Sequence, residues 1–343
     1  MLVKLKDISK VVGGATPSTQ VSEYYNGNIV WITPKDLADN KDNKYIDCGE
    51  RNITKLGFEK SNTHLIPPNN ILISTRAPIG YMAINRKECC TNQGFKSLIC
   101  NINLVNVDFL YYYLKTKIKA LESLGTGTTF KEVSKEAVEN FEIDLPPLEI
   151  QDKIANILSN IDNQIERNNA MSKRLQILGN TIYSKIMTIP KTKKLLGELV
   201  EMYQPETITS DKFIENGKYP IYGAGGIIGF YDNYNHENSE LMVSCRGVCG
   251  KPEISLPKSF IIGNQMVIKP NNEKLKYFLY NYLLNCDLSC VETGSVQKQI
   301  TRTNLEQLSI LLPSESIINE HYNVFKNIYD RKIQIVLETE KLN

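Results

Sequence analysis

The 343-residue sequence contains no apolar run long enough to cross a membrane, and no charged-then-apolar segment at its N-terminus. It also lacks the short motifs of several enzyme classes. These missing motifs are the GxxxxGK[ST] phosphate loop, the HExxH zinc site, the GxSxG nucleophile elbow and the Asn/Asp-Pro-Pro-aromatic motif that adenine methyltransferases place against a flipped base. We therefore expect a cytoplasmic protein, without a membrane partner, that performs no catalysis by itself.

Metal-binding and nucleotide-binding patterns are weak. The three histidines stand in unrelated contexts: His64, His236 and His321. The eight cysteines include the pairs Cys245/Cys249 and Cys286/Cys290, but neither pair is CxxC and no histidine is near in sequence, so we favour buried free thiols over a zinc site. The glycine-rich segment YPIYGAGGIIGFYDN, from Tyr219, fails GxGxxG by one residue and disfavours a nucleotide site.

Length and composition favour two domains and a connector. A chain of this length exceeds one typical domain and suits two of about 150 residues each. Hydrophobic residues make up 41% of the chain and charged residues 23%, which is typical of a globular protein with real cores. The net charge of +2 says nothing by itself, because basic and acidic side chains can segregate onto different faces.

The segment from Pro146 to about Ile189 predicts one long helix. Two prolines suit its first turn, and Pro190 ends it. Apolar residues recur at heptad spacing, which predicts a narrow seam against a partner helix. The seam residues of the two helices predicted in the chain are Ile150, Ile154, Ile157, Ile161, Met171, Leu175, Leu178 and Ile182 in the first, and Ile317, Val324, Ile328 and Ile335 in the second.

The residues on either side of that helix repeat each other. ILISTRAPIG (71–80) matches LMVSCRGVCG (241–250), TNQGF (91–95) matches GNQMV (263–267), and FLYYYL (109–114) matches FLYNYL (278–283). Residues 127–146 then align without a gap on 294–313, and each copy is followed by a heptad-like helix. Several matches in the same order indicate a duplicated unit of globular domain plus long helix.

This duplication predicts the architecture. We expect two α/β (α+β) domains, each with a small irregular sheet, separated by a pair of long antiparallel coiled-coil helices with pseudo-twofold symmetry. The predicted ranges are a first domain at 1–146, a central spacer helix at 147–189, a second domain at 190–313, and a C-terminal helix at 314–343 that pairs with the spacer.

Basic residues recur at matching positions of the two halves. Arginine and lysine on loops and helix starts, near Thr, Ser, Asn and Gln, are the residue types that hold phosphates and read base edges. The alternative is solvated surface charge. The candidate DNA-binding residues are Arg76, Lys131, Lys135, Arg246, Lys251, Lys298 and Arg302.

Several longer segments of the sequence resemble a known protein family. LPPLEIQDKIANILSNIDNQIE, from Leu145, resembles the conserved region of specificity subunits of type I restriction-modification systems. The segments beginning at Val3 and Lys218 look like the starts of their target-recognition domains, and GTGTTFKEVS and GSVQKQIT, from Gly125 and Gly294, like the closing segments.

The resemblance implies a DNA-binding role. Each target-recognition domain would read one half of a bipartite site on double-stranded DNA, and the helices would set the gap between the halves. Two adenine-methylating modification subunits and ATP-driven restriction subunits would be partners. S-adenosylmethionine, ATP and Mg would belong to those partners, and this chain would carry no cofactor. The second helix has only thirty residues before Asn343 where the family often continues, which is compatible with a shortened chain and leaves open whether one modification subunit can dock.

Two other classes stay open. One is a coiled-coil interaction module that dimerises and grips protein without DNA specificity, which would show no strong salt dependence of DNA affinity. The other is a zinc-dependent or nucleotide-dependent enzyme built on the cysteine pairs or the glycine-rich segment, which metal analysis of the purified chain would detect.

Overall fold

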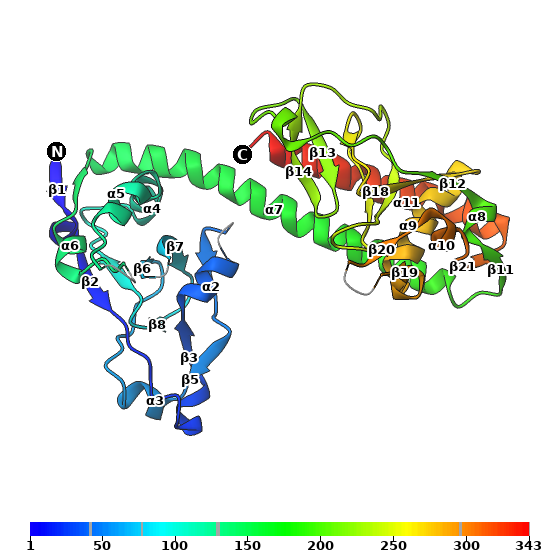
Figure 1. Cartoon of the computed structure of the whole chain (residues 1–343). Helices are drawn as coiled ribbons and strands as arrows, with labels where there is room; N and C mark the ends of the chain where they lie inside the picture. Colours follow the sequence, from blue (N-terminus) through cyan, green and yellow to red (C-terminus); the bar gives the residue numbers. More distant parts are fainter. Residues whose placement is uncertain (41–42, 77, 128–130, 295–296, 343) are drawn as a thin grey trace. The chain divides into compact units, whose positions relative to one another are not determined.

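The computed structural model describes residues 1–40, 43–76, 78–127, 131–294 and 297–342 (Figure 1). The chain divides into two compact units, Met1–Glu166 and Arg167–Asn343. The division falls inside one continuous helix, α7 (Leu148–Ile186), so each unit takes part of that helix. In the described part of the chain no helix is both long and apolar enough to span a bilayer.

Unit 1 contains two small sheets and a terminal strand pair. The larger sheet has the order β2-β9-β6-β7-β4: Ser9–Gly13, Lys96–Cys100, Ile71–Thr75, Ile79–Asn85 and Tyr45–Ile46. The second has the order β5-β3-β8: Arg51–Ile53, Tyr25–Ile32 and Cys89–Thr91. β1 (Leu2–Lys4) pairs antiparallel with β10 (Glu142–Asp144), which joins the start of the unit to the segment entering α7.

The helices of unit 1 are short apart from α4 and α7. They are α1 (Leu5–Ile8), α2 (Pro34–Asp39), α3 (Lys55–Glu59), α4 (Val107–Thr116), α5 (Ile118–Ser123) and α6 (Lys135–Glu139), with a 3₁₀ turn η1 at Ser22–Tyr24. Apolar residues of α4, β6 and β7 form the main core, and Ala155 of α7 is buried against it. The packing of α7 on this core therefore begins within its first two turns.

Unit 2 repeats this plan. Its larger sheet has the order β12-β18-β15-β16: Val200–Tyr203, Gln265–Pro270, Leu241–Ser244 and Pro252–Ile254. The second has the order β14-β13-β17: Gly226–Tyr231, Tyr219–Gly223 and Phe260–Ile261. β11 (Lys191–Leu195) pairs antiparallel with β21 (Ser309–Pro313), and β19 (Glu292–Thr293) pairs with β20 (Gln299–Ile300).

The helices of unit 2 follow the same order as those of unit 1. They are α8 (Leu196–Leu199), α9 (Lys276–Leu284), α10 (Arg302–Glu306) and α11 (Glu315–Glu340), with 3₁₀ turns η2 at Ser210–Lys212, η3 at Glu273–Leu275 and η4 at Leu288–Val291. Residues of α9, α11 and β15 share one core with the C-terminal part of α7. The predicted α/β duplication is confirmed.

Matching hydrogen bonds show how closely the units correspond. The hydroxyl of Tyr113 on α4 accepts from the backbone N–H of Asp144 at 3.0 Å, and that of Tyr282 on α9 accepts from Leu311 at 3.2 Å. The sequence match at 91–95 is corrected, however. The N–H of Thr75 donates to Gly94 and that of Cys245 to Asn264, so Gly94 corresponds to Asn264 and the sequence alignment was two residues out of register.

Within unit 2, α7 and α11 run antiparallel. Asn168 Nδ2 donates to Thr339 Oγ1 at 3.0 Å, Lys332 bonds Gln176, and Tyr329 packs against Gly179. Residues later in α7 therefore contact residues earlier in α11, as expected for antiparallel helices. A β-carbon at Gly179 would lie 2.8 Å from the Tyr329 hydroxyl, so this close approach requires glycine.

The buried face of α7 differs from the predicted seam. Ile328 and Ile335 are buried, and Leu175, Ile182, Ile317 and Ile161 are partly buried. Met171, Leu178, Val324, Ile150, Ile154 and Ile157 are exposed, which corrects the predicted position of these six in a buried seam. The buried positions of α7 instead include Gln151, Ala155, Gly179 and Tyr183, because each part of the helix also packs against the globular domain of its own unit.

Candidate nucleic-acid interface

In unit 1, the segment that closes the domain lies against the end of β6. The backbone of Arg76 forms a bridge with Glu132, and Glu132 also forms a bridge with Thr126. The N–H of Val133 donates to the carbonyl of Thr75 at 3.0 Å. These contacts bring together the segments that carry Arg76 and Lys131, although the two residues are more than fifty positions apart in sequence. Both residues are exposed.

Unit 2 builds the same arrangement. Arg246 follows β15 and its backbone bridges to Gln299 of β20. The N–H of Ile300 donates to the carbonyl of Cys245 at 3.0 Å, as Val133 donates to Thr75 in unit 1. Since the bridge partners Glu132 and Gln299 stand at the offset of 167 found in the sequence, the two arginines occupy one structural position.

In unit 2 the turn between β13 and β14 also lies close to the segment that carries Arg246. Gly247 has a φ of +77°, and a β-carbon there would lie 3.3 Å from Cβ of Ala224 in the turn between β13 and β14. The following residue, Val248, is 61% exposed. Arg246 and Val248 therefore present a cation and an exposed apolar side chain two residues apart in sequence.

Ion pairing separates the candidate cations. Four of them pair within their own unit: Lys135 with Glu139 at 3.5 Å, Lys298 with Glu292 at 2.7 Å, Arg302 with Glu306 at 2.7 Å, and Lys251 with Glu253 at 3.0 Å. No ion pair of Arg76, Lys131 or Arg246 occurs among the residues that the structure describes. These three are the cations most available to a phosphate or base edge, because no pair within the described chain must be broken first.

Lys135 and Arg302 occupy the first turns of α6 and α10, which begin at capping hydroxyls. Ser134 Oγ accepts from the N–H of Ala137 at 3.1 Å, and Thr301 Oγ1 accepts from that of Asn304 at 3.2 Å. Lys251 faces the turn of Gly226 instead, where a β-carbon would lie 3.8 Å from its ammonium.

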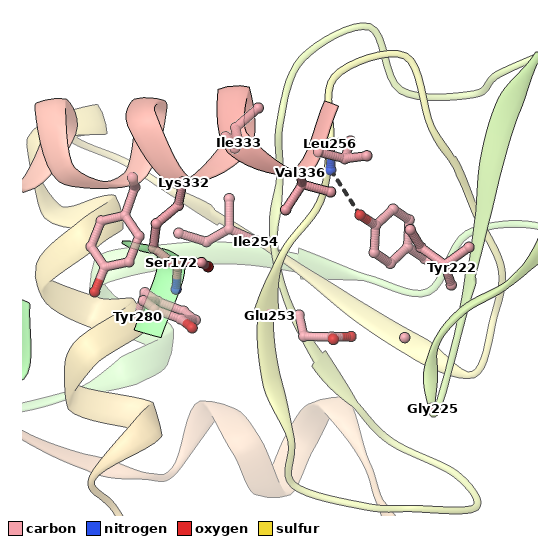
Figure 2. Close-up of a pocket in the computed structure, with 13 residues that line it drawn as sticks. Ser172, Tyr222, Gly225, Glu253, Ile254, Leu256, Tyr280, Lys332, Ile333 and Val336 are labelled. Carbon is pink, nitrogen blue, oxygen red and sulfur yellow. Dashed lines mark hydrogen bonds between the residues drawn. The ribbon is translucent and has the colours of Figure 1, made fainter. Parts of the chain in front are cut away.

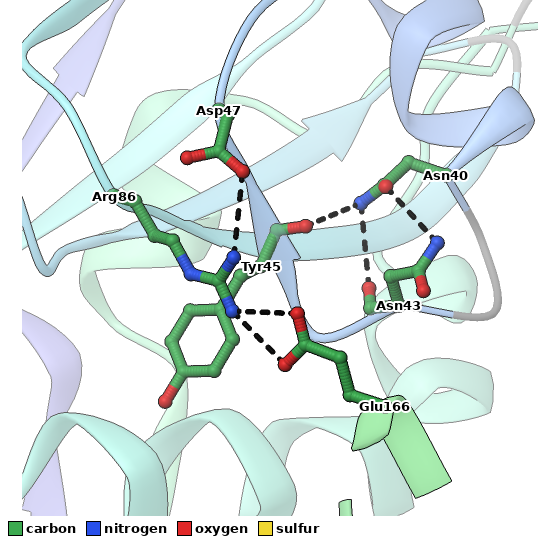
Figure 3. A network of polar contacts seen from close by, with 6 residues as sticks. All are labelled: Asn40, Asn43, Tyr45, Asp47, Arg86 and Glu166. Atoms are coloured by element: carbon green, nitrogen blue, oxygen red, sulfur yellow. Dashed lines mark hydrogen bonds and ion pairs between the residues drawn. The ribbon is translucent and has the colours of Figure 1, made fainter. Parts of the chain in front are cut away.

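Sequence reasoning missed the contacts that attach α7 to unit 1. Arg86 forms ion pairs with Asp47 at 3.4 Å and with Glu166 of α7 at 2.9 Å, and its guanidinium lies 4.5 Å from the ring centroid of Tyr45 (Figure 3). Asn40 holds the same strand by donating to the carbonyl of Tyr45 at 2.9 Å. The hydrogen bond with Glu166 raises the pKa of Arg86, so the guanidinium keeps its positive charge.

A second polar group holds α7 one to two turns earlier. The buried ammonium of Lys44 pairs with Asp108 at 2.7 Å and donates to Ser159 Oγ of α7 at 2.8 Å. Tyr112 donates to Asp162 of α7 at 2.6 Å, and burial together with that bond raises the pKa of the tyrosine. Because these residues are scattered through the sequence without a common spacing, no pattern could have grouped them.

All eight cysteines are free thiols; Cys89, Cys90 and Cys245 are buried, but Cys48 and Cys290 are exposed, which corrects the expected burial of Cys290. Cys245 is buried with Sγ 3.2 Å from the carbonyl of Asn264, and burial raises its pKa. Burial also raises the pKa of Cys89 and Cys90 to about 12. Within the described ranges no three histidine, cysteine, aspartate or glutamate side chains come together to hold a metal ion.

Comparisons with known proteins agree with the geometry. A family model described as the type I restriction modification DNA specificity domain matches residues 1–176 and 190–342. The MjaIX specificity subunit of Methanocaldococcus jannaschii is 43% identical over 175 residues, covering 50% of this chain and 40% of that protein. The EcoprrI specificity subunit of Escherichia coli is 22% identical over 335 residues, covering 90% of this chain and 82% of that protein.

A solved structure shares the fold over the whole length. The crystal structure of the type I restriction-modification S subunit from Mycoplasma genitalium superposes with a TM-score of 0.69 at 17% identity, covering 100% of this chain and 92% of that one. At this identity the likeness shows the fold. The matched region spans less than half of the MjaIX subunit.

Proposed function

The chain belongs to the family of type I restriction modification DNA specificity domains, and from that premise we propose that it recognises a bipartite site on double-stranded DNA, one half per unit. The observation that carries the proposal is the repeated placement of Arg76 and Arg246. Both are exposed, neither forms an ion pair among the described residues, and both bridge to the closing segment of their domain. Two arginines at equivalent exposed positions in one chain suit a DNA site with two halves.

Membership of this family also suggests the protein partners of the chain. The two relatives described above carry names of type I restriction enzyme specificity subunits, so we propose that this chain brings modification and restriction subunits to DNA and performs no catalysis. S-adenosylmethionine, ATP and Mg would then be bound by those subunits, and the complex would work in the cytoplasm. A purified chain that methylated or cleaved DNA by itself would contradict this assignment.

Half-site selection tests the recognition. The chain, reconstituted with its modification subunits, is presented with randomised duplexes, and the bound sequences are read for wild type, Arg76→Ala and Arg246→Ala. Each variant should weaken binding by about 1–3 kcal/mol and relax discrimination in one half of the site, as expected for loss of a bidentate base contact. Lys153→Ala, which removes an exposed cation of α7 paired with Glu149, is the matched charge control.

The outcomes separate three readings. Equal loss of discrimination in both halves would indicate a folding defect, which circular dichroism would detect. A loss equal to that of Lys153→Ala would assign the arginines to ordinary surface charge. A duplex affinity without salt dependence would favour a protein-gripping module, because phosphate contacts release counterions.

A further inference from the structure

The loop that joins β15 to β16 in unit 2 is closed by a buried serine. Ser244 Oγ accepts from the N–H of Lys251 at 2.9 Å, and this serine is fully buried. The loop that joins β6 to β7 in unit 1 is closed in the same way, since Ser74 Oγ accepts from the N–H of Tyr81 at 2.9 Å and Ser74 is also fully buried. Donor and acceptor are seven residues apart in both cases, so the two loops have the same length.

Both loops also end against the same structural position. Gly250 has a φ of +75°, and a β-carbon there would lie 3.3 Å from Cβ of Leu288. Gly80 has a φ of +93°, and a β-carbon there would lie 2.8 Å from Cγ2 of Ile118. The glycines and the residues beside them stand at one sequence offset, which is also the offset between the two exposed arginines. The loops that carry these arginines are therefore equivalent in length, closure and packing.

In unit 2 a neighbouring turn supports the loop from another side. A β-carbon at Gly247 would lie 3.3 Å from Cβ of Ala224, in the turn between β13 and β14. That turn is itself anchored, because the hydroxyl of Tyr222 in β13 accepts from the N–H of Leu256 at 3.1 Å (Figure 2). Support from two sides favours a loop backbone that is ordered before any ligand binds.

An exposed apolar side chain stands two residues after each arginine. Val248 is 61% exposed, and Pro78 in unit 1 is exposed as well. A single exposed apolar residue is ordinary on a protein surface. An apolar residue at the same position of both units, near an arginine that forms no ion pair among the described residues, favours contact with a ligand instead.

The chemistry of base edges indicates what this apolar group would contact. Thymine carries a 5-methyl group in the major groove, and it is the one apolar substituent that the four bases present there. Arginine reads guanine or holds a phosphate, so the two side chains suit neighbouring parts of one DNA site. A protein partner fits less well, because a stable interface covers about 800 Å² on each side and one valine supplies only a small part of that area.

We propose that Val248 contacts the 5-methyl group of a thymine in the half-site that unit 2 reads, and that Pro78 makes the corresponding contact in the other half-site. The inference rests on the proposed DNA recognition and adds to it a specificity-determining residue near each arginine. Because the loop of Val248 is closed by Ser244 and packed at Gly250, little conformational freedom is lost when the valine meets the methyl group.

Replacement of thymine by deoxyuridine tests the contact, because it removes the methyl group and leaves the base-pair hydrogen bonds in place. The chain, reconstituted with its modification subunits, first selects its site from randomised duplexes, and the half-site that Arg246→Ala relaxes is assigned to unit 2. Each thymine of that half-site, on either strand, is then replaced singly, and affinity is measured by fluorescence anisotropy at one salt concentration. One replacement should weaken binding by the wild-type chain about fourfold, as expected for one buried methyl group.

Substitutions in the protein assign this effect to the valine. The replacement that weakens wild-type binding should have little effect on binding by the Val248→Ala chain, because the contact is already lost. Val324→Ala removes the same atoms from an exposed valine of α11 and should keep the full effect of the replacement. Pro78→Ala should remove the corresponding effect in the other half-site only.

Three results would overturn the methyl contact. They are a unit 2 half-site without thymine on either strand, a wild-type affinity that no replacement changes, and an equal effect of the replacement on the wild-type and Val248→Ala chains. In each of these cases, a selected half-site that depends on Arg246 would leave the proposed DNA recognition in place. Selection of no sequence at all would overturn both the recognition and the contact.

Discussion

Gly179→Ala should destabilise unit 2, although alanine is the better helix former. The new β-carbon would lie 2.8 Å from the Tyr329 hydroxyl and 3.5 Å from Oδ1 of Asn281. The hydroxyl must move, which breaks its 2.8 Å hydrogen bond to Asn281 in a place where both residues are buried. Losing that bond costs about 1–3 kcal/mol and the crowding a similar amount, against a gain of about 1 kcal/mol from helix propensity.

The expected net loss is therefore about 3 kcal/mol, and its sign should depend on a single oxygen atom. In a Tyr329→Phe background that oxygen is gone, and the nearest ring atom of residue 329 lies 3.5 Å from the new β-carbon, an ordinary contact. Gly179→Ala should then stabilise the chain by about 0.5–1 kcal/mol through helix propensity alone.

Hydrogen exchange followed by mass spectrometry provides the measurement. Peptides from α9 and α11 report opening of unit 2, and peptides from β6 and β7 of unit 1 serve as the internal control. Equal destabilisation by Gly179→Ala in both backgrounds would refute the reasoning, because the clash would then not involve the hydroxyl. Altered exchange in unit 1 would show that the effect is not local.

Three further outcomes are expected. Seven residues inserted after Arg167, where α7 passes from one unit to the other, lengthen the helix by about 10 Å. The gap between the unchanged half-sites should then lengthen by about 3 base pairs. An unchanged gap would show that the length of the helix does not set the spacing of the half-sites. Lys44→Met should destabilise unit 1 by about 3 kcal/mol in urea unfolding, because Asp108 loses a buried partner, and an effect under about 0.5 kcal/mol would contradict the assigned pair. Burial lowers the pKa of His236, so the unfolded chain binds the proton more readily than the folded chain. Unit 2 should therefore lose stability as pH falls below the ordinary histidine pKa of about 6.5. His236→Gln should make the stability of unit 2 less dependent on pH, and an unchanged pH dependence would refute this explanation.

The candidate interface could be predicted in part. The matching positions of Arg76 and Arg246 were visible in the sequence, because flanking strands repeat at a recognisable offset. Their pairing with Glu132 and Gln299 was not visible, since a backbone bridge between distant segments leaves no local pattern. The ion pairs that occupy Lys135, Lys298 and Arg302 likewise depend on rotamers and neighbours; whether any of the seven basic residues contacts DNA remains a prediction.

Repeats, heptad spacing and proline positions are local signals, so the duplication, the family and the long helix that ends before Pro190 could all be predicted from the sequence. Which face of that helix is buried could not, because it depends on the packing of the folded chain. Heptad spacing marks an apolar stripe, but Ile157 and Leu178 on that stripe are exposed, while Gln151 and Gly179 are buried. The physical reason is that burial depends on every surface packed against the helix. Polar residues such as Gln151 are buried where the domain supplies their hydrogen-bond partners, and Gly179 is buried where Tyr329 needs the space.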